Sequence, residues 1–393
     1  MKKNNLKIEF PNPQLPLTVI VAKTNWNEPP RMRHHIAYQL MRKFNVLFVE
    51  FYPNSARNED QFTLINNRLG VLNTAVKFNI HDTIYVNCPP VHAIINYFYA
   101  KHLSKLIKSS NANEVYLFNF AWNFFSIFKL AIFRLKIYVC IDEFPLMLSK
   151  GKWNIKRFYQ RNLFQKYENS VARQANFCYT PHVALKEKLS KVNSDVRMLF
   201  HAFNDFEQTP NPNLEFQNFE KPDQKVKLGF AGYIHYRLDK NVIKELLENE
   251  NNLVYLIGPL DPSFDIEYIS KYPNLTLTGA LSERDMLDKL GEMDVLIIPY
   301  ITELPEVKVL TTVSKLFQYI STLKPIVISD MPNFIKFPEG VVYKVSKSDC
   351  FDEIVQYANS QNSDFFRKLR LNVLLNNTWK SRGNQIFSDI AKL

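Results

Sequence analysis

Residues 313–327 read VSKLFQYISTLKPIV. The apolar residues of this stretch recur at spacings of three, four and seven, which places on one helix face Leu316, Tyr319, Ile320 and Leu323. The run that begins at Pro325 is short and apolar, as in a buried strand. The stretch therefore predicts a helix over 314–322 followed by a strand over 325–329, a unit typical of α/β folds.

The start of this helix carries residues suited to an anion. Thr311, Thr312 and Ser314 are each competent N-caps, and Lys315 follows them. Free backbone amides, a hydroxyl and an ammonium would favour a diphosphate there. Gln318, one turn further, could hydrogen-bond a ribose or sugar hydroxyl. An ordinary amphipathic helix with a solvated lysine and glutamine fits the same spacing, and spacing alone favours that interpretation.

Similar alternation extends on both sides of this stretch. In the second half we expect strands over 227–234, 253–257, 275–278, 295–299 and 341–345, and helices over 238–248, 283–290 and 350–360. In the first half we expect strands over 18–22, 46–51, 84–86, 115–120 and 137–141, and a helix around 124–133. Short apolar runs between amphipathic segments indicate parallel sheets covered by helices on both faces. The predicted fold class is α/β, with ligands beyond the carboxyl ends of the strands.

The length of 393 residues predicts two domains, since a single core rarely grows that large. Residues 206–224 are rich in Pro, Asn and acidic residues and lack periodicity, which is typical of a linker. We therefore expect an acceptor-binding Rossmann-like domain over 1–205 and a nucleotide-sugar-binding one over 225–375, doubly wound and facing a cleft. A C-terminal helix over 376–393 could pack back on the first domain.

Charge is uneven along the chain. Residues 1–205 hold 28 Lys/Arg and 13 Asp/Glu, a net of +15, whereas residues 206–393 hold 21 and 25, a net of −4. A basic half favours an anionic partner such as a nucleic acid, an acidic membrane surface or a pyrophosphate-bearing substrate. A nucleic-acid binder is the weakest of these hypotheses, because no recognition module is present and the charges are dispersed. A solubilising surface is the alternative for any individual lysine.

Several function classes lack their usual signatures. HExxH, GxxxxGK[ST] and GxGxxG do not occur in the sequence, and its four cysteines are scattered singly. We expect no metal, no cofactor and a reducing compartment. The most apolar region, 115–133, is interrupted by Asn119, Asn123, Ser126 and Lys129, so a membrane span is not expected. The charged residues of the first ten positions argue against a signal peptide.

The 313–327 stretch, together with the sequence before it, resembles the donor site of GT-B-fold glycosyltransferases. There a helix reading roughly P-x-K-L-x-E-Y-x-A precedes G-K-P-V-V. The teichuronic-acid glycosyltransferases have similar segments in the same order. In this chain the segments are Gly229–Tyr233 with Arg237, then 255–259, 277–279 and 294–300. The resemblance covers roughly residues 225–330. It implies the GT-B fold and a nucleotide-sugar site formed by Gly232, Arg237, Tyr300, Val313, Ser314, Lys315 and Gln318.

Two departures from the family pattern bear on the reaction. Many retaining members have two glutamates flanking seven residues, and here those positions hold Leu310 and Gln318. A lysine followed three residues later by glutamine, with a tyrosine upstream comparable to Tyr300, resembles the inverting glucuronosyltransferase of xanthan assembly. The resemblance implies a UDP-sugar donor, with UDP-glucuronate as one option, and inversion. Lys315 would then neutralise phosphate.

The first half resembles the same family more faintly. Asp142 and Glu143 follow a predicted strand, as does an acidic pair in the family. An inverting transfer needs one base to deprotonate the acceptor hydroxyl, and Asp142 is the first candidate and Glu143 the second. A solvated Asp-Glu pair at a strand end, or a helix cap, fits nearly as well. Among residues 30–35, three are candidates for binding an acceptor phosphate: Arg31, Arg33 and His34.

The sequence thus predicts a cytoplasmic transferase that adds a sugar to a polysaccharide or lipid-linked oligosaccharide. Its basic first domain, with the aromatic-basic segment 97–102, would rest peripherally on the inner face of the cell membrane. Two alternatives stay open. One is a nucleotide-sugar epimerase of the same fold, and the other is a non-catalytic glycan- or nucleotide-binding partner in a synthase complex, since both motif glutamates are missing.

Overall fold

The computed structural model describes residues 6–51, 59–74, 82–147, 155–204 and 225–393. The chain divides into two compact units, Met1–Phe200 and His201–Leu393. The predicted linker 206–224 lies outside the described residues. The domain boundaries drawn from the sequence, and the packing of residues 376–393, stay predictions.

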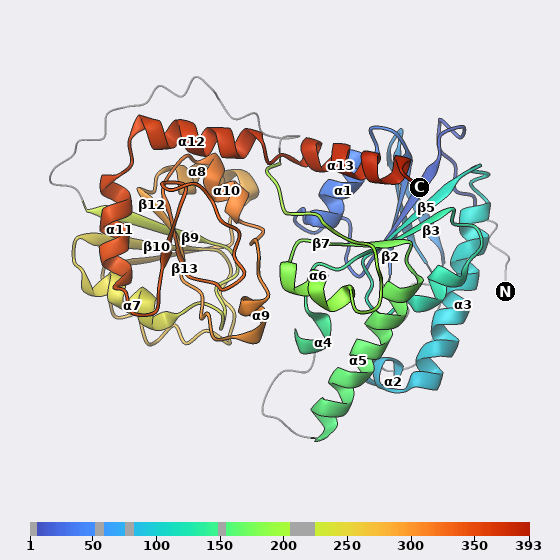
Figure 1. Ribbon diagram of the computed structural model, residues 1–393, viewed down its shortest axis with the longest axis horizontal. Helices are drawn as coiled ribbons and strands as arrows, with labels where there is room; N and C mark the ends of the chain where they lie inside the picture. Colours follow the sequence, from blue (N-terminus) through green and yellow to red (C-terminus); the bar gives the residue numbers. More distant parts are fainter. Residues whose placement is uncertain (1–5, 52–58, 75–81, 148–154, 205–224) are drawn as a thin grey trace. The chain divides into compact units, whose positions relative to one another are not determined.

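The first unit contains an eight-stranded sheet in the order β3-β4-β2-β1-β5-β6-β7-β8 (Figure 1). Every neighbouring pair is parallel except β3 and β4. The strands are β1 Leu17–Ala22, β2 Asn45–Glu50, β3 Gln61–Asn66, β4 Leu69–Asn73, β5 Val115–Asn119, β6 Leu135–Val139, β7 Phe177–Thr180 and β8 Val196–Met198. The helices are α1 Met32–Leu40, α2 Asp82–Asn87, α3 Pro89–Lys108, the 3₁₀ helix η1 Phe125–Lys129, α4 Phe144–Met147, α5 Ile155–Gln174 and α6 Val183–Leu189.

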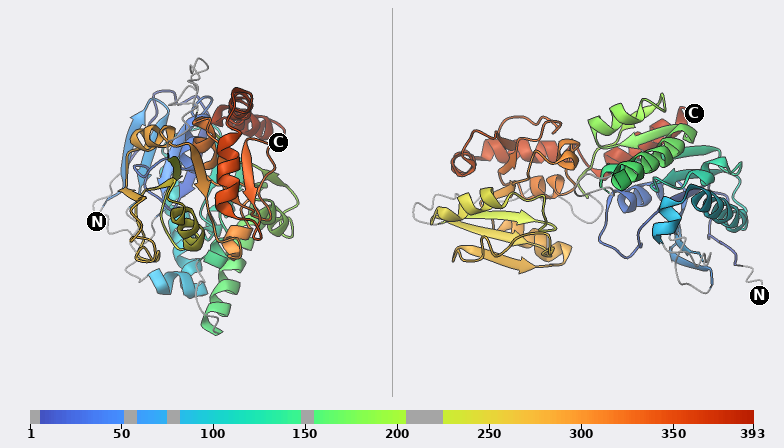
Figure 2. Two further views of the ribbon diagram at one scale, coloured as in Figure 1. Left: turned by 90° about the vertical axis from the view of Figure 1, so that its left-hand side faces the viewer. Right: turned by 90° about the horizontal axis from the view of Figure 1, so that it is seen from below.

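The second unit contains a six-stranded parallel sheet in the order β11-β10-β9-β12-β13-β14 (Figures 1 and 2). Its strands are β9 Val226–Ala231, β10 Asn252–Ile257, β11 Leu275–Gly279, β12 Val295–Ile298, β13 Ile326–Ser329 and β14 Val342–Val345. Its helices are α7 Lys240–Glu248, α8 Glu283–Gly291, α9 Pro305–Lys308, α10 Leu316–Ser321, α11 Phe351–Ser360, α12 Asp364–Leu375 and α13 Trp379–Ala391.

In both sheets the direction in which the chain adds strands reverses once, as it does in doubly wound folds. The chain builds outward from β9 through β10 to β11, and then returns to the other side of β9 with β12. In the first unit the same reversal falls between β1 and β5. Such a reversal leaves a crevice beyond the carboxyl ends of the strands, where α/β folds bind ligands. The loops that follow β9 and β12 lie at this crevice in the second unit.

Burial explains why the central strands read as apolar runs. All six residues of β1 and of β2 are buried, and so are all four of β12 and β13. A strand covered by helices on both faces has no polar face to display. The antiparallel edge strand β3 is largely exposed and correspondingly more polar.

Three expectations from the sequence are wrong. Residues 84–86, predicted as a strand, lie in helix α2. The helix expected around 124–133 is a five-residue 3₁₀ turn, η1. The helix predicted over 314–322 begins at Leu316 with Lys315 as its N-cap, so none of Thr311, Thr312 and Ser314 caps it.

Candidate functional site

Two glycines lie at the carboxyl edge of the second sheet, where the loops after β9 and β10 approach each other. Gly232 follows β9 with φ +135°, and Gly258 follows β10 with φ +140°, which side chains rarely tolerate. The Gly232 amide donates to the Ile257 carbonyl at 2.8 Å. A Cβ at Gly258 would stand 2.1 Å from the Gly232 carbonyl oxygen. The two loops can approach this closely only because both positions are glycine.

Lys315 projects into this edge beside Gly232. Its Nζ lies 3.7 Å from the centre of the Phe230 ring and 5.5 Å from that of Tyr300. A Cβ added at Gly232 would meet Nζ at 2.6 Å, so the glycine leaves room for the ammonium. Phe230 and Tyr300 are buried, and the two rings form an aromatic floor on which the cation is held by its attraction to their π faces.

Lys315 lacks an opposite charge beside it among the residues that the structure describes. Within the described part of the chain, no carboxylate forms an ion pair with Lys315 or with Arg237. Burial holds the pKa of Lys315 well below its usual value, and the positive charge of Arg237 lowers it further. An anion in this position would relieve both effects, because it would supply the missing counter-charge.

Arg237 is held by its neighbours on the loop after β9. Its backbone carbonyl accepts from the Ile301 amide at 2.9 Å, which ties this loop to the one after β12. Its Nε donates to the Tyr236 hydroxyl at 3.4 Å, and that hydroxyl donates to Glu306 Oε1 at 2.8 Å. Glu306 therefore helps to orient Arg237 through Tyr236.

Helix α10 is anchored to the same edge by Tyr319. The hydroxyl of this buried residue accepts a hydrogen bond from the Ala231 amide at 2.6 Å, at the end of β9.

Two further polar side chains lie near this edge. Burial raises the pKa of Tyr300 to about 12, so its hydroxyl stays protonated at neutral pH. Gln318 donates to Glu283 Oε1 of α8 at 3.3 Å.

The structure brings four of the seven predicted donor residues into one cluster: Gly232, Arg237, Tyr300 and Lys315. The other three lie on or next to α10. Val313 is buried, Ser314 is exposed and Gln318 is half-buried against α8. Their contact with a donor stays a prediction. Sequence reasoning missed the floor residue Phe230, although it stands in the quoted series, and Tyr236 and Glu306.

Asp142 and Glu143 follow β6 in the first unit, as expected, but Glu143 is not open to solvent. Lys188 of α6 contacts Glu143 Oε1 and Glu168 Oε2, each at 2.6 Å. The Glu168 carboxylate is fully buried and also accepts from the Tyr138 hydroxyl at 3.0 Å. Glu143, Glu168 and Lys188 form an ion triad, of which Glu168 is buried and the other two are half-buried. Sequence reasoning missed it, since no motif links residues so far apart.

The ion triad explains the electrostatics of Glu143. Burial raises the pKa of this carboxyl, while the nearby Lys188 ammonium acts in the opposite direction. For Lys188, burial favours the neutral amine, but the two carboxylates prevail and raise its pKa. A carboxylate engaged in this way is less available as a base. The role of Asp142 and Glu143 as candidate bases stays a prediction.

Arg31, Arg33 and His34 lie around the start of α1. The Arg31 amide donates to Nδ1 of His34 at 3.0 Å, and the His34 ring stacks on Phe48. Burial, assisted by the charge of Arg33, lowers the pKa of His34 to about 4, so the ring is neutral near pH 7. His34 therefore supplies no positive charge at that pH. Only Arg31 is exposed, and binding of an acceptor phosphate by these residues stays a prediction.

Neither a metal cluster nor a membrane span is found in the part of the chain that the structure describes. No group of three His, Cys, Asp or Glu residues there is placed to hold a metal ion. No helix among the same residues is long and apolar enough to cross a membrane.

The two doubly wound units define the chain as a GT-B fold. It is similar to the sucrose-phosphate synthase structure from Thermosynechococcus elongatus, with a TM-score of 0.67 and 9% identity over 96% of this chain and 99% of that one. It is also similar to Anabaena HepE in complex with UDP, with a TM-score of 0.59 and 10% identity over 97% and 100%. At these identities the likeness shows the fold, and the predicted fold class is confirmed.

A relative in sequence is the Bacillus subtilis (strain 168) protein named "Putative teichuronic acid biosynthesis glycosyltransferase TuaH". The two are 24% identical over 270 residues, which cover 65% of this chain and 66% of that protein. The match thus spans just under two thirds of the relative. No protein-family model matches the chain. The predicted resemblance to the teichuronic-acid glycosyltransferases is confirmed.

Proposed function

We propose that this chain is a glycosyltransferase that moves a sugar from a nucleoside-diphosphate sugar to a saccharide acceptor. The observation that carries the proposal is the pair of uncompensated cations, Lys315 and Arg237, at the carboxyl edge of the second sheet. Transfer of a glycosyl group leaves a diphosphate whose charge must be stabilised. The name of the Bacillus subtilis relative and the UDP complex of HepE support this direction.

The donor we propose is a UDP-sugar, with UDP-glucuronate among the sugars to be tested. The diphosphate would lie against Lys315 and Arg237, and the sugar towards Tyr300 and Gln318. Bound diphosphate would raise the lowered pKa of Lys315, because the charged form gains a partner. Above that lowered pKa, binding should therefore take up a proton, and affinity should fall as the pH rises.

The reaction we propose is a single displacement with inversion. The positions that hold two glutamates in retaining relatives are occupied by buried Leu310 and by the amide Gln318. Asp142 would accept the proton of the acceptor hydroxyl as its oxygen bonds to the anomeric carbon. The bond from that carbon to the diphosphate breaks, and UDP leaves with the electron pair. The acceptor class we propose is a polysaccharide or a lipid-linked oligosaccharide.

We further propose that the chain needs no resident metal or cofactor, since Lys315 and Arg237 can supply the positive charge that the leaving group requires. The nucleotide-sugar is then a substrate. Turnover that persists in excess EDTA is the expected result. Strict dependence on an added divalent cation would contradict this part of the proposal.

The donor proposal is tested by thermal unfolding of the full chain with UDP, GDP or ADP. A ligand that binds only the folded state stabilises it by about 2.7 kcal/mol at a concentration one hundred times its Kd. We expect UDP to raise the Tm more than GDP or ADP does. Stabilisation by GDP without stabilisation by UDP would overturn the donor assignment.

The role of Asp142 is tested by release of UDP from UDP-glucose and UDP-glucuronate, with water as a slow acceptor. Asp142→Asn should lower the rate of release at least tenfold while UDP still raises the Tm, because the residue acts on the acceptor. An unchanged rate would remove Asp142 from the reaction. Conversion of the sugar without UDP release would instead indicate an epimerase, and binding without either reaction a non-catalytic partner.

A further inference from the structure

A residue with a strained backbone lies at the end of helix α10. Leu323 has φ +58°, and among the described residues Asn111 is the other non-glycine residue with a positive φ. Asparagine tolerates this conformation because its short polar side chain can bond to the backbone, whereas the Cβ of leucine comes too close to the following carbonyl oxygen. The side chain of Leu323 is buried. A strained conformation persists only where the surrounding structure imposes it.

The strain arises where α10 turns sharply into strand β13. The helix ends at Ser321 and the strand begins at Ile326, so the residues 322–325 make the whole turn. The Leu323 amide donates to the Ile320 carbonyl at 3.0 Å, which closes the last turn of the helix. Helices commonly end with a left-handed residue in this place, and it is usually glycine. Here a leucine adopts the conformation that glycine adopts without cost.

Arg370 of α12 is bonded to this turn. Its Nη1 donates to the Leu323 carbonyl oxygen and to Oδ1 of Asn362, each at 2.8 Å. Its Nε donates to the Gly340 carbonyl oxygen, in the turn before β14, at 2.9 Å. Arg370 is fully buried, and burial lowers its pKa to about 10, so the guanidinium stays charged at neutral pH. Hydrogen bonds from a charged donor are stronger than those between neutral groups, so Arg370 can hold the strained turn.

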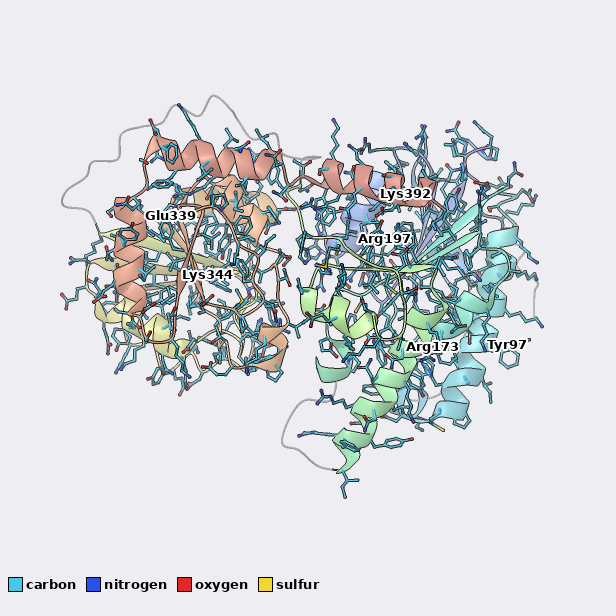
Figure 3. All side chains as sticks on the ribbon, viewed as in Figure 1. Tyr97, Arg173, Arg197, Glu339, Lys344 and Lys392 are labelled. Carbon is cyan, nitrogen blue, oxygen red and sulfur yellow. The ribbon has the colours of Figure 1, made fainter. Side chains whose placement is uncertain are left out.

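Helix α12 packs against both elements that Arg370 joins. A Cβ added at Gly340 would overlap the ring of Phe366, so this α12 side chain lies directly against the backbone of the turn before β14. Figure 3 labels Glu339, the residue before Gly340, and α12 runs above it in that view. Helix α12 also packs against α10 (Figure 1). One helix therefore supports the end of α10 and the start of β14 together.

The strained turn and the candidate donor site lie at opposite ends of α10. The helix connects the carboxyl end of β12 to the start of β13, and parallel strands start at the edge opposite to the one where they end. Lys315 is the N-cap of α10 and lies beside Gly232, whereas Leu323 follows the last turn. A helix of six residues moves as one body. A change at Leu323 is therefore transmitted to Lys315.

We propose that Arg370 is a positioning residue for the donor site, because it holds the strained turn at Leu323 and thereby fixes the helix that carries Lys315. This inference rests on the proposed function, which supplies the diphosphate that Lys315 contacts. Without the hydrogen bond from Arg370, Leu323 relaxes towards negative φ, the last turn of α10 opens, and Lys315 shifts on the Phe230 ring. Glycine at position 323 would adopt the turn unaided, and Arg370 would then be dispensable.

The test is titration calorimetry of the full chain with UDP. Arg370→Met should weaken UDP binding roughly tenfold, since side chains that contact no ligand can change affinity by about 2- to 30-fold. The double variant R370M/L323G should regain most of the affinity, whereas R370M/L323A should not, because alanine at positive φ is strained as leucine is. The matched control is Arg367→Met, which removes another buried arginine of α12, paired with Asp364, and should leave UDP affinity unchanged.

Equal UDP affinity in R370M and the wild type would overturn the inference, even with a lower Tm, because a purely structural role changes only the Tm. Equal recovery in the glycine and alanine double variants would also overturn it, since strain at Leu323 would not be the cause. If R370M does not fold, R370K with the same two substitutions at Leu323 gives the same comparison, because a lysine lacks the fork that reaches both carbonyls. No UDP binding by the wild type would overturn the proposed function and this inference with it, whereas unchanged affinity in R370M overturns the inference alone.

Discussion

The edge after β9 and the loop after β6 differ in whether their cationic side chains have carboxylate partners. In the second unit Lys315 lies over the rings of Phe230 and Tyr300, and neither Lys315 nor Arg237 has a carboxylate partner among the described residues. In the first unit Lys188 stands between Glu143 and Glu168 and is fully compensated. An uncompensated cation destabilises the free protein and is suited to an incoming anion, whereas a compensated one stabilises the fold. On this contrast we base the proposal that the first region binds an anion and the second holds the fold.

The largest effect is expected from breaking the compensated region. Lys188→Met should destabilise the chain by about 3–5 kcal/mol, because it leaves the Glu168 carboxylate buried without a counter-charge. Urea unfolding measures the change. The double variant K188M/E168Q should recover much of the loss, since Gln can still accept from Tyr138. A single variant as stable as the wild type would show that the triad does not hold the fold.

Acid should destabilise the first unit through His34. Its pKa is about 4 in the fold and 6.5 in the unfolded chain, so the unfolded state binds more protons between these values. The stability that this residue contributes is complete above pH 6.5 and is lost by pH 4, a change of about 3 kcal/mol.

His34→Asn is the matched variant, because the Asn side chain can still accept from the Arg31 amide. Urea unfolding between pH 4 and 7 should show a shallower pH dependence for it than for the wild type. Equal slopes would mean that His34 is not the neutral, buried group described above.

Gly232→Ala should weaken UDP binding roughly tenfold, because a methyl group 2.6 Å from Nζ would displace Lys315 and strain a backbone with positive φ. The control is Gly291→Ala at the end of α8, where an added Cβ meets nothing within 4 Å. Titration calorimetry compares the two. Similar affinities would show that the approach of Lys315 to Gly232 does not shape the site.

The smallest effect is expected at Gln318. Gln318 now donates to Glu283 at 3.3 Å, so a glutamate in its place would bring two carboxylates together. These like charges repel each other, and UDP affinity should fall by a few fold. The double variant Q318E/E283Q should restore it. A gain in sugar transfer by Q318E would contradict the inverting scheme, since it would restore the glutamate of the retaining pattern.

The second unit could be predicted from the sequence more fully than the first. Its buried parallel strands read as short apolar runs between amphipathic helices, and each predicted strand overlaps an observed one. The start of α10 was predicted two residues early, because Lys315 itself adopts helical dihedrals as N-cap while Thr311 and Thr312 are buried.

The first unit shows where periodicity fails. Residues 84–86 are β-branched or aromatic, which favours a strand, but they lie inside helix α2, which ends at Asn87. Strands β3 and β4 were not predicted, because β3 is an exposed antiparallel edge without an apolar run. The ion triad was not predicted either, since Glu143, Glu168 and Lys188 come together through the packing of α5 against β6 and of α6 against β7. The grouping of Gly232, Arg237, Tyr300 and Lys315 could be predicted because these residues belong to one ordered series of segments.

The central claim is that the edge after β9 binds a nucleoside diphosphate through Lys315. The most direct measurement is calorimetric titration of the full chain with UDP, comparing the wild type, Lys315→Met and the exposed-lysine control Lys368→Gln on α12. Loss of a charge-assisted contact should weaken UDP binding roughly 10- to 150-fold in K315M, with K368Q unchanged. The free K315M chain should also be at least as stable as the wild type, because an uncompensated cation is gone. Equal UDP affinity in all three proteins would contradict the account.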